Sequence, residues 1–250
     1  MTMLQTLPAE LAQLSTVSMV VGAAWVLVMI CVPIFRWVLG EGAERVGISL
    51  GVLFQAATVA VLLFEGLPPW HAAAAVIGIP LFGWAVEFVG SRTGFPFGGY
   101  QYTDVLQPQI RHVPVVIPLA WLMMIPPAWA IGGLLAGPHG TTVAVLLSGL
   151  AFMAWDLFLD PQMVSWDFWR WRDRGVYVGI PLSNFVGWFG AGTVVSLIFY
   201  TPDIPVAPLL LVYIITWILE TIGQLAFWKM IVSGIIGFFA MGALIFAALL

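Results

Sequence analysis

The sequence predicts an all-α, polytopic membrane helix bundle, and three observations lead to this fold class. Hydrophobic residues make up 62% of the 250 residues and charged residues only 8%, with a mean hydropathy of +1.04. Soluble domains carry about a quarter charged residues. The apolar residues form long runs, and the few basic residues fall between alternate runs. We therefore predict one integral membrane domain over residues 1–250.

The apolar runs divide into about eight segments of spanning length. Each run is continuously apolar, without the two-residue alternation of a membrane β-strand, so each is expected to be a helix. The last two are separated only by a short turn near Lys229. In chain order, the predicted helices cover residues 15–37, 46–65, 70–90, 114–136, 140–160, 182–200, 206–224 and 230–250.

The basic residues predict the orientation of these helices. All eight lie in the connections that follow the first, third, fifth and seventh helices: Arg36, Arg45, Arg92, Arg111, Arg170, Arg172, Arg174 and Lys229. The positive-inside rule makes this side cytoplasmic and places both termini on the outer side of the plasma (inner) membrane. No basic residue precedes Arg36, so a cleaved signal peptide is not expected. The charges form no basic patch for nucleic acid.

Acidic and amide side chains gather near the same side of the membrane. Glu87 lies near the end of the third helix, Asp156 and Asp160 near the end of the fifth, and Glu220 near the end of the seventh; Asn184 opens the sixth. All lie beneath the two longest connections, residues 91–113 and 161–181. Acids within a membrane are costly unless they are paired, protonated or facing a cavity, so this layer predicts a functional site.

Asp156 and Asp160 are four residues apart and share one helix face. Two carboxylates in a low-dielectric site repel, so the pair is expected to hold a proton between them and to titrate as a unit. Such a pair suits acid–base chemistry on an uncharged substrate. Alternatively, Asp160 ends the helix before Pro161 and Asp156 pairs with an arginine. Glu87 and Glu220 have similar structural alternatives.

Aromatic side chains surround the same region. They predict either a pocket for a long conjugated apolar ligand, whose developing positive charge would be stabilised by aromatic faces, or an interfacial aromatic belt. The belt is the stronger interpretation for Trp166, Trp169 and Trp171. The residues that we expect to bind substrate are Phe97, Tyr100, Tyr102, Trp155, Tyr177, Asn184 and Trp188.

The motifs of metal and nucleotide sites are missing from the sequence. No His, Cys and Asp spacing is typical of a metal site, and GFPFGG lacks the Lys-Ser/Thr of a phosphate-binding loop. His112, in the first long connection, is more simply an interfacial histidine. We therefore expect no metal and no cofactor.

The sequence resembles the CruF-type carotenoid biosynthesis family, the membrane carotenoid 1',2'-hydratases. The resemblance is carried by GFPFGGYQYTD (94–104), WDLFLDP (155–161) and GVYVGIPLSNFVGW (175–188), and it extends over roughly residues 45–230. It implies addition of water to the terminal double bond of an acyclic carotenoid end group, giving a tertiary alcohol. The implied partners are a carotenoid, water and the lipid bilayer.

The residue roles follow from our own interpretation of the polar layer. Asp156 and Asp160 are expected to supply a proton, and Glu87 or Glu220 to position or deprotonate water. Tyr100, Tyr102 and Asn184 would orient the water or the acid.

Three alternative functions begin from the same residues. A lycopene-type cyclase would protonate the same end group but capture the cation with a neighbouring double bond. A prenyltransferase would use the Asp156/Asp160 spacing, although a second Asp-rich motif for magnesium is missing. A proton-coupled transporter would also place acids in the membrane, although usually near the midplane.

Overall fold

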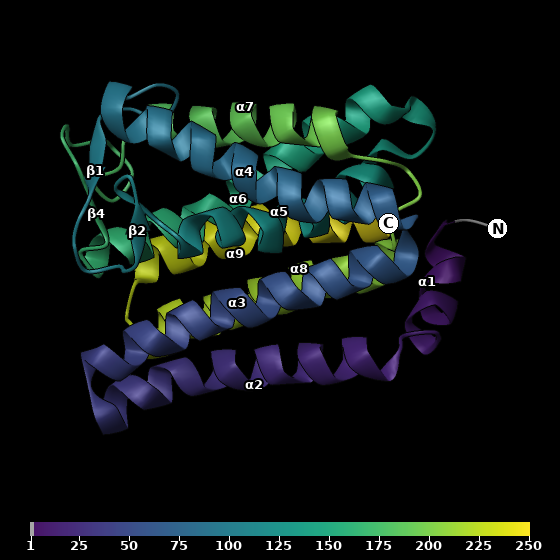
Figure 1. Cartoon of the computed structure of the whole chain (residues 1–250), viewed down its shortest axis with the longest axis horizontal. Helices are drawn as coiled ribbons and strands as arrows, with labels where there is room; N and C mark the ends of the chain where they lie inside the picture. Colours follow the sequence, from purple (N-terminus) through teal and green to yellow (C-terminus); the bar gives the residue numbers. More distant parts are fainter. Residues whose placement is uncertain (1–2) are drawn as a thin grey trace.

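The computed structural model describes residues 3–250, which form a bundle of roughly parallel and antiparallel helices closed at one end by short strands (Figure 1). The α-helices of the described residues are α1 (Met3–Ala12), α2 (Thr16–Leu39), α3 (Glu41–Gly66), α4 (Pro69–Thr93), α5 (Val116–Ala136), α6 (Thr141–Ser165), α7 (Leu182–Phe199), α8 (Val206–Ile222) and α9 (Ile231–Leu249). A 3-10 turn, η1 (Gly137–His139), links α5 to α6, and a π-helical turn, η2 (Gly223–Phe227), extends α8.

The eight predicted spans are confirmed. Within residues 3–250, eight helices are long and apolar enough to cross a membrane, with mean hydropathies of 1.5 to 2.5 over their best windows. Their outer faces expose large apolar side chains, such as Trp37, Val186 and Leu197. In water these faces would be unfavourable, whereas lipid solvates them, so the chain is an integral membrane protein. The short helix α1 before the first span was not predicted.

Helix α6 is longer than predicted and continues through Pro161 to Ser165. Asp160 therefore lies inside the helix, and the alternative in which it ends the helix is wrong. A proline inside a helix removes one backbone donor and crowds the carbonyl of the preceding turn, and neighbouring groups in a membrane bundle can compensate for the freed backbone groups. As a result, α6 carries both aspartates, one turn apart, on a regular scaffold.

Helix α5 is the central helix, because 78% of its apolar window is buried, against 22% for α2. Small residues bring it close to its neighbour: a Cβ atom added to Gly132 would lie 2.2 Å from Oγ of Ser148 on α6. Gly149 makes the same close approach possible between α6 and Thr193 on α7. Helices in membranes pack through such small residues, and here they hold α5, α6 and α7 together beneath the site.

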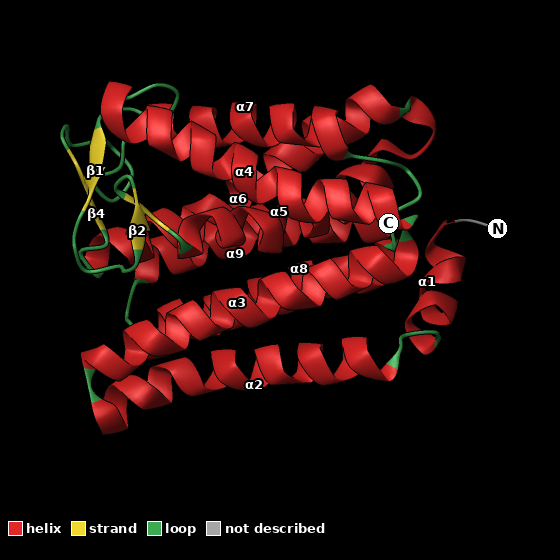
Figure 2. Cartoon of the chain, in the orientation of Figure 1, coloured by secondary structure: helices red, strands yellow, loops and turns green. Residues whose placement is uncertain are grey.

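Short strands cover one end of the bundle, shown in yellow in Figure 2. Strand β1 (Tyr100–Tyr102) from the first long connection pairs antiparallel with β4 (Trp169–Trp171) from the second, and β2 (Gln109–Ile110) pairs with β3 (Val113–Pro114). Gly94 ends α4 in the left-handed conformation (φ +80°), which turns the chain back over the bundle. The basic residues lie in or beside the connections at this end, whereas α1 and the C-terminus lie at the other (Figure 1).

Candidate active site

The two-residue repeat of β1 and β4 places four aromatic side chains over the bundle. Tyr100 lies opposite Trp171 and Tyr102 opposite Trp169, while Gln101 pairs with Arg170. Successive side chains of a strand point to opposite faces, so the tyrosines and tryptophans share one face of this ribbon. Gln101 and Arg170 are exposed, which shows that the aromatic face is the one turned inward.

Glu87 is held by aromatic donors. It is only 4% exposed, near the end of α4. Its Oε2 atom accepts hydrogen bonds from the hydroxyls of Tyr100 and Tyr102, the latter at 2.7 Å. Nε1 of Trp121 lies 3.4 Å from Oε1, at the limit of a hydrogen bond. The partners of Glu87 are thus neutral phenols and an indole in place of the arginine considered from the sequence.

The tyrosine hydroxyls remain protonated donors over a wide pH range. Burial, and next the negative charge of Glu87, raises the pKa of both Tyr100 and Tyr102 well above the usual value. The charge of Asp160 adds to this effect on Tyr100. Asp160 and Glu87 therefore act on the same phenol, although they lie on different helices.

Asp156 and Asp160 are joined by Asn184. Its Nδ2 atom, in the first turn of α7, lies 2.6 Å from Oδ2 of each aspartate. All three side chains are at most 2% exposed. An amide nitrogen has two N–H groups, so it can donate to both carboxylates at once without adding a positive charge.

Oδ1, the other carboxylate oxygen of Asp160, accepts hydrogen bonds from strand β4 of the β1/β4 ribbon. Nε1 of Trp169 lies 2.6 Å from Oδ1 of Asp160, and Nε1 of Trp171 lies 3.2 Å from the same atom. One strand of the ribbon thus bonds Glu87 and the other bonds Asp160. In contrast, Oδ1 of Asp156 is enclosed and has no hydrogen-bond partner among the described residues.

A largely apolar cavity lies beneath the ribbon. Its empty space is about 1020 Å³, counted together with the opening at its mouth. Helices α2 to α8 and the two long connections contribute to its wall, and apolar residues such as Val52, Leu106 and Met123 provide much of its surface. The wall also carries a small number of polar residues: Gln55, Glu87, Tyr100, Tyr102, Asp160, Gln162, Asn184, Thr216 and Glu220.

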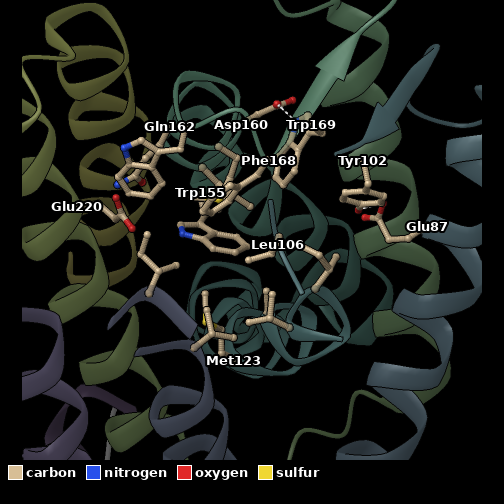
Figure 3. Close-up of a pocket in the computed structure, with 18 of the residues that line it drawn as sticks. Glu87, Tyr102, Leu106, Met123, Trp155, Asp160, Gln162, Phe168, Trp169 and Glu220 are labelled. Atoms are coloured by element: carbon tan, nitrogen blue, oxygen red, sulfur yellow. Dashed lines mark hydrogen bonds between the residues drawn. The ribbon is translucent and has the colours of Figure 1, made fainter. Parts of the chain in front are cut away.

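The structure brings four members of the predicted polar layer together and leaves one apart. Glu87, Asp156, Asp160 and Asn184 cluster under the ribbon, although Asp156 does not line the cavity. Glu220 lies on the opposite side of the cavity from Glu87, with Trp155 between them (Figure 3). Sequence spacing could place these residues at one depth but could not separate them laterally.

Most of the predicted substrate-binding residues line the cavity. Phe97, Trp155 and Trp188 do so together with the polar residues already described. Trp188 stacks on Trp121, with ring centroids 5.4 Å apart and an interplanar angle of 21°. Tyr177 is the exception, because its hydroxyl donates to the backbone carbonyl of Leu157 at 2.8 Å and ties the second long connection to α6.

Sequence reasoning missed the roles of Trp121, Trp169 and Trp171 as hydrogen-bond donors to the acids. For Trp169 and Trp171 the sequence favours an interfacial aromatic belt instead. The signal was present in the alternation of Tyr-Gln-Tyr and Trp-Arg-Trp, which is typical of a strand with one buried face. Among the described residues, no group of three or more His, Cys, Asp or Glu side chains is placed to hold a metal ion.

Comparison with known proteins gives two matches. The family model described as "Carotenoid biosynthesis protein" matches residues 47–249. A bisanhydrobacterioruberin hydratase from Haloarcula japonica is 34% identical over 154 residues, which cover 59% of this chain and 52% of the relative. The chain thus spans about half the length of this relative. No solved structure matches the chain.

Proposed function

Because the chain belongs to the carotenoid biosynthesis protein family, we propose that it is a carotenoid 1',2'-hydratase. It would add water to the terminal double bond of an acyclic carotenoid end group by acid catalysis. The similarity to a relative named as a hydratase supports hydration as the reaction. The proposal extends that activity to this chain and assigns it to the cavity beneath the β1/β4 ribbon.

The observation that carries the proposal is that Glu87 and Asp160 face one apolar cavity from two helices. The ribbon bonds both of them, through Tyr100 and Tyr102 on one side and Trp169 and Trp171 on the other. An alkene has no group that forms strong hydrogen bonds, so its recognition requires an apolar wall. Its activation requires a strong acid, and both features meet here.

The proposed reaction begins with proton transfer from the Asp156/Asp160 pair to one alkene carbon. The π electrons form the new C–H bond, and a tertiary cation develops at the other carbon. A water oxygen then donates a lone pair to that carbon, and a carboxylate accepts the proton that the water loses. The net change is the addition of one H₂O across the double bond. The acid pair regains its proton from the site or from solvent, and no redox step occurs.

Glu87 is the better placed of the two candidate bases. It lies on the same side of the cavity as the ribbon that bonds Asp160, whereas Glu220 lies across the cavity (Figure 3). Tyr102 and Tyr100 would hold Glu87 in position, and Asn184 would hold the acid pair. Glu87 would also attract the developing cation electrostatically.

The aromatic wall would protect the cation. Trp188, Trp155 and Phe97 line the cavity, and Trp188 packs within 6.0 Å of the other two rings, measured between centroids. The negative faces of aromatic rings stabilise cations within about 6 Å. Because these rings carry no nucleophile of comparable strength, water is left as the group that captures the cation.

The substrate would enter from the bilayer, in which carotenoids dissolve. The end of the bundle that carries the basic residues would face the cytoplasm. Labelling of single cysteines introduced into the 91–113 and 161–181 connections, in a Cys31→Ser background, tests this orientation. Labelling by an impermeant maleimide from the outside of intact cells would contradict it.

Expression in a lycopene-producing bacterium tests the reaction. We expect a pigment heavier by one water with an unchanged chromophore, measured by liquid chromatography and mass spectrometry. Growth in H₂¹⁸O should place the label in the new hydroxyl. A product of unchanged mass with shifted absorption would show that the reaction is cyclisation and not hydration. If lycopene and other acyclic carotenes supplied as substrates all remain unchanged, the proposal is contradicted.

A further inference from the structure

A buried carboxyl group on the far side of the cavity has no partner that explains it. Glu220 is 9% exposed and lines the cavity, yet none of the hydrogen bonds or ion pairs of the described residues includes its side chain. Its Oε2 atom is fully enclosed and unpaired. Buried polar groups are nearly always hydrogen-bonded, so an unpaired one at a cavity wall indicates a missing partner.

A second unpaired group lies beside the same part of the cavity. Trp155 is 1% exposed, and its Nε1 atom has no acceptor among the described residues. In Figure 3 its indole nitrogen is on the side of the ring where Glu220 lies. A carboxyl group and an indole N–H are thus both unsatisfied in one region, on α8 and α6 respectively.

The chemistry of these two groups defines the missing partner. The indole N–H can only donate, so the partner must accept a hydrogen bond, which excludes an ammonium group. The residues that line the cavity include no Lys, Arg or His, so an anion would lie near Glu220 without compensating charge. A carbonyl can accept but cannot donate to a carboxylate. A hydroxyl does both and suits either protonation state of Glu220.

Several polar side chains close to Glu220 in the chain or in the cavity wall bond to other protein groups. Nε2 of Gln55 donates to Oγ1 of Thr216 at 3.0 Å, and Oγ1 of Thr216 donates to the carbonyl of Val212 at 2.9 Å. Gln224 bonds the Phe158 carbonyl and accepts from Ser233. Gln162, by contrast, lines the cavity beside Glu220 (Figure 3), and its side-chain amide has no hydrogen bond among the described residues. The groups left for a ligand in this region are therefore those of Glu220, Trp155 and Gln162.

We infer that the Glu220 carboxyl and the indole N–H of Trp155 form a hydroxyl-binding subsite, across the Trp155 ring from the reacting end at Glu87 and Asp160. This inference rests on the proposed function, because the subsite lies in the cavity that would bind the carotenoid and would recognise a hydroxyl group of the bound molecule. The hydroxyl belongs either to a carotenoid that is already oxygenated or to a water molecule held beside an unsubstituted one. The subsite would distinguish oxygenated acyclic carotenoids from hydrocarbons of the same length.

The experiment compares two acyclic carotenoids, one a hydrocarbon and one bearing a tertiary hydroxyl, with the purified full-length protein in detergent. Binding is measured by quenching of tryptophan fluorescence, and turnover by chromatography of extracted pigments. The variants are Glu220→Leu, Glu220→Gln and Trp155→Phe. Glu65→Gln is the matched control, because Glu65 is a carboxyl bonded to Ser15 and Ser18 far from the cavity.

If the bound hydroxyl belongs to the carotenoid, the wild-type protein should bind the alcohol more tightly than the hydrocarbon. Glu220→Leu should then lower the ratio of the two affinities by about 10-fold or more, because the site loses the group that recognises the hydroxyl. Glu220→Gln, which keeps an acceptor, should restore part of the ratio. If the hydroxyl belongs to a bound water molecule, Glu220→Leu should instead lower the affinity for both pigments by the same factor. Unchanged affinities in folded Glu220→Leu and Trp155→Phe proteins would overturn the subsite.

The two proposals fail in different ways. If the wild-type protein binds both pigments and the ratio shifts in Glu220→Leu, but neither pigment is hydrated, the subsite stands and the proposed reaction does not. If hydration occurs and no Glu220 or Trp155 variant changes affinity, the reaction stands and the subsite does not. Glu65→Gln should keep the wild-type ratio in either case.

Discussion

Asp156 and Asp160 lie one turn apart on α6 and share a single donor, because the side-chain nitrogen of Asn184 is 2.6 Å from a carboxylate oxygen of each. A lysine or arginine at this position would neutralise the pair with a full positive charge. The amide holds the two carboxyl groups in place and adds no positive charge. This arrangement is what an acid catalyst for an uncharged alkene requires.

Asn184→Leu should therefore abolish turnover and destabilise the fold. The variant leaves two buried carboxyl groups without their common donor, and each lost hydrogen bond to a charged group costs about 1.5–3 kcal/mol. We expect turnover to fall at least about 100-fold, a typical contribution of positioned acid–base groups, and the apparent Tm in detergent to fall by several degrees. Thr193→Val is the matched control on α7, because its hydroxyl oxygen is buried and bonds to nothing in the described residues. A stable, active Asn184→Leu protein would contradict the shared-donor role.

Asp156→Asn and Asp160→Asn should each abolish turnover while leaving the protein folded. The amide keeps the size of the carboxyl group and its acceptor oxygen, but it cannot donate a proton to an alkene. General acids contribute about 10²–10⁴-fold to a rate, and pigment analysis would measure a loss of this size. Asp167→Asn provides the control, since the half-exposed Asp167 side chain pairs with Arg170 at 2.6 Å and exposed pairs contribute about 0–1 kcal/mol. Full turnover in folded Asp156→Asn would leave Asp160 as the only proton donor of the pair.

The stability of the protein should decrease above about pH 10, the ordinary tyrosine pKa. Burial and the charge of Glu87 raise the folded-state pKa of Tyr100 and Tyr102. The unfolded chain then ionises first, so this contribution to stability is complete below about pH 10 and is lost as the pH rises towards the folded-state values. Thermal unfolding between pH 8 and pH 11 measures it.

The double variant Tyr100→Phe/Tyr102→Phe should flatten this alkaline decrease. It should also lower stability at neutral pH, because Glu87 loses two donors. An alkaline decrease of the same size in the double variant would assign it to another group, such as Tyr177, whose pKa is also raised by burial.

Glu87→Leu and Glu220→Leu should differ in their effect on stability. Glu87 accepts from Tyr100 and Tyr102, so its removal leaves buried donors unpaired, at a cost of about 1–3 kcal/mol for each. The Glu220 carboxyl accepts from no described residue, so its replacement by an apolar side chain should change the free energy of unfolding of the pigment-free protein by less than about 1 kcal/mol. The apparent Tm of both variants in the same detergent, without pigment, tests the contrast. Equal losses would mean that Glu220 has a partner in the pigment-free protein.

The sequence by itself determined the membrane fold and the depth of the polar layer. Continuous apolar runs must form helices in lipid, because no water is available to satisfy the backbone there. The order of the spans and the position of the basic residues then place Glu87, Asp156, Asp160, Asn184 and Glu220 near one end of the bundle. These inferences rest on local properties of the chain and need no knowledge of how the helices pack.

Only the tertiary structure decided which of these residues meet. Helix packing put Asn184 between the two aspartates and moved Glu220 across the cavity. Pairing of Tyr100–Tyr102 with Trp169–Trp171, segments about 70 residues apart, joined Glu87 and Asp160 under one ribbon. Depth along a helix follows from residue number at about 1.5 Å per residue, whereas lateral position follows from contacts between distant segments. For this reason the sequence could predict a layer of acids, and the fold alone could divide it into a cluster beneath the ribbon and a single acid, Glu220, across the cavity.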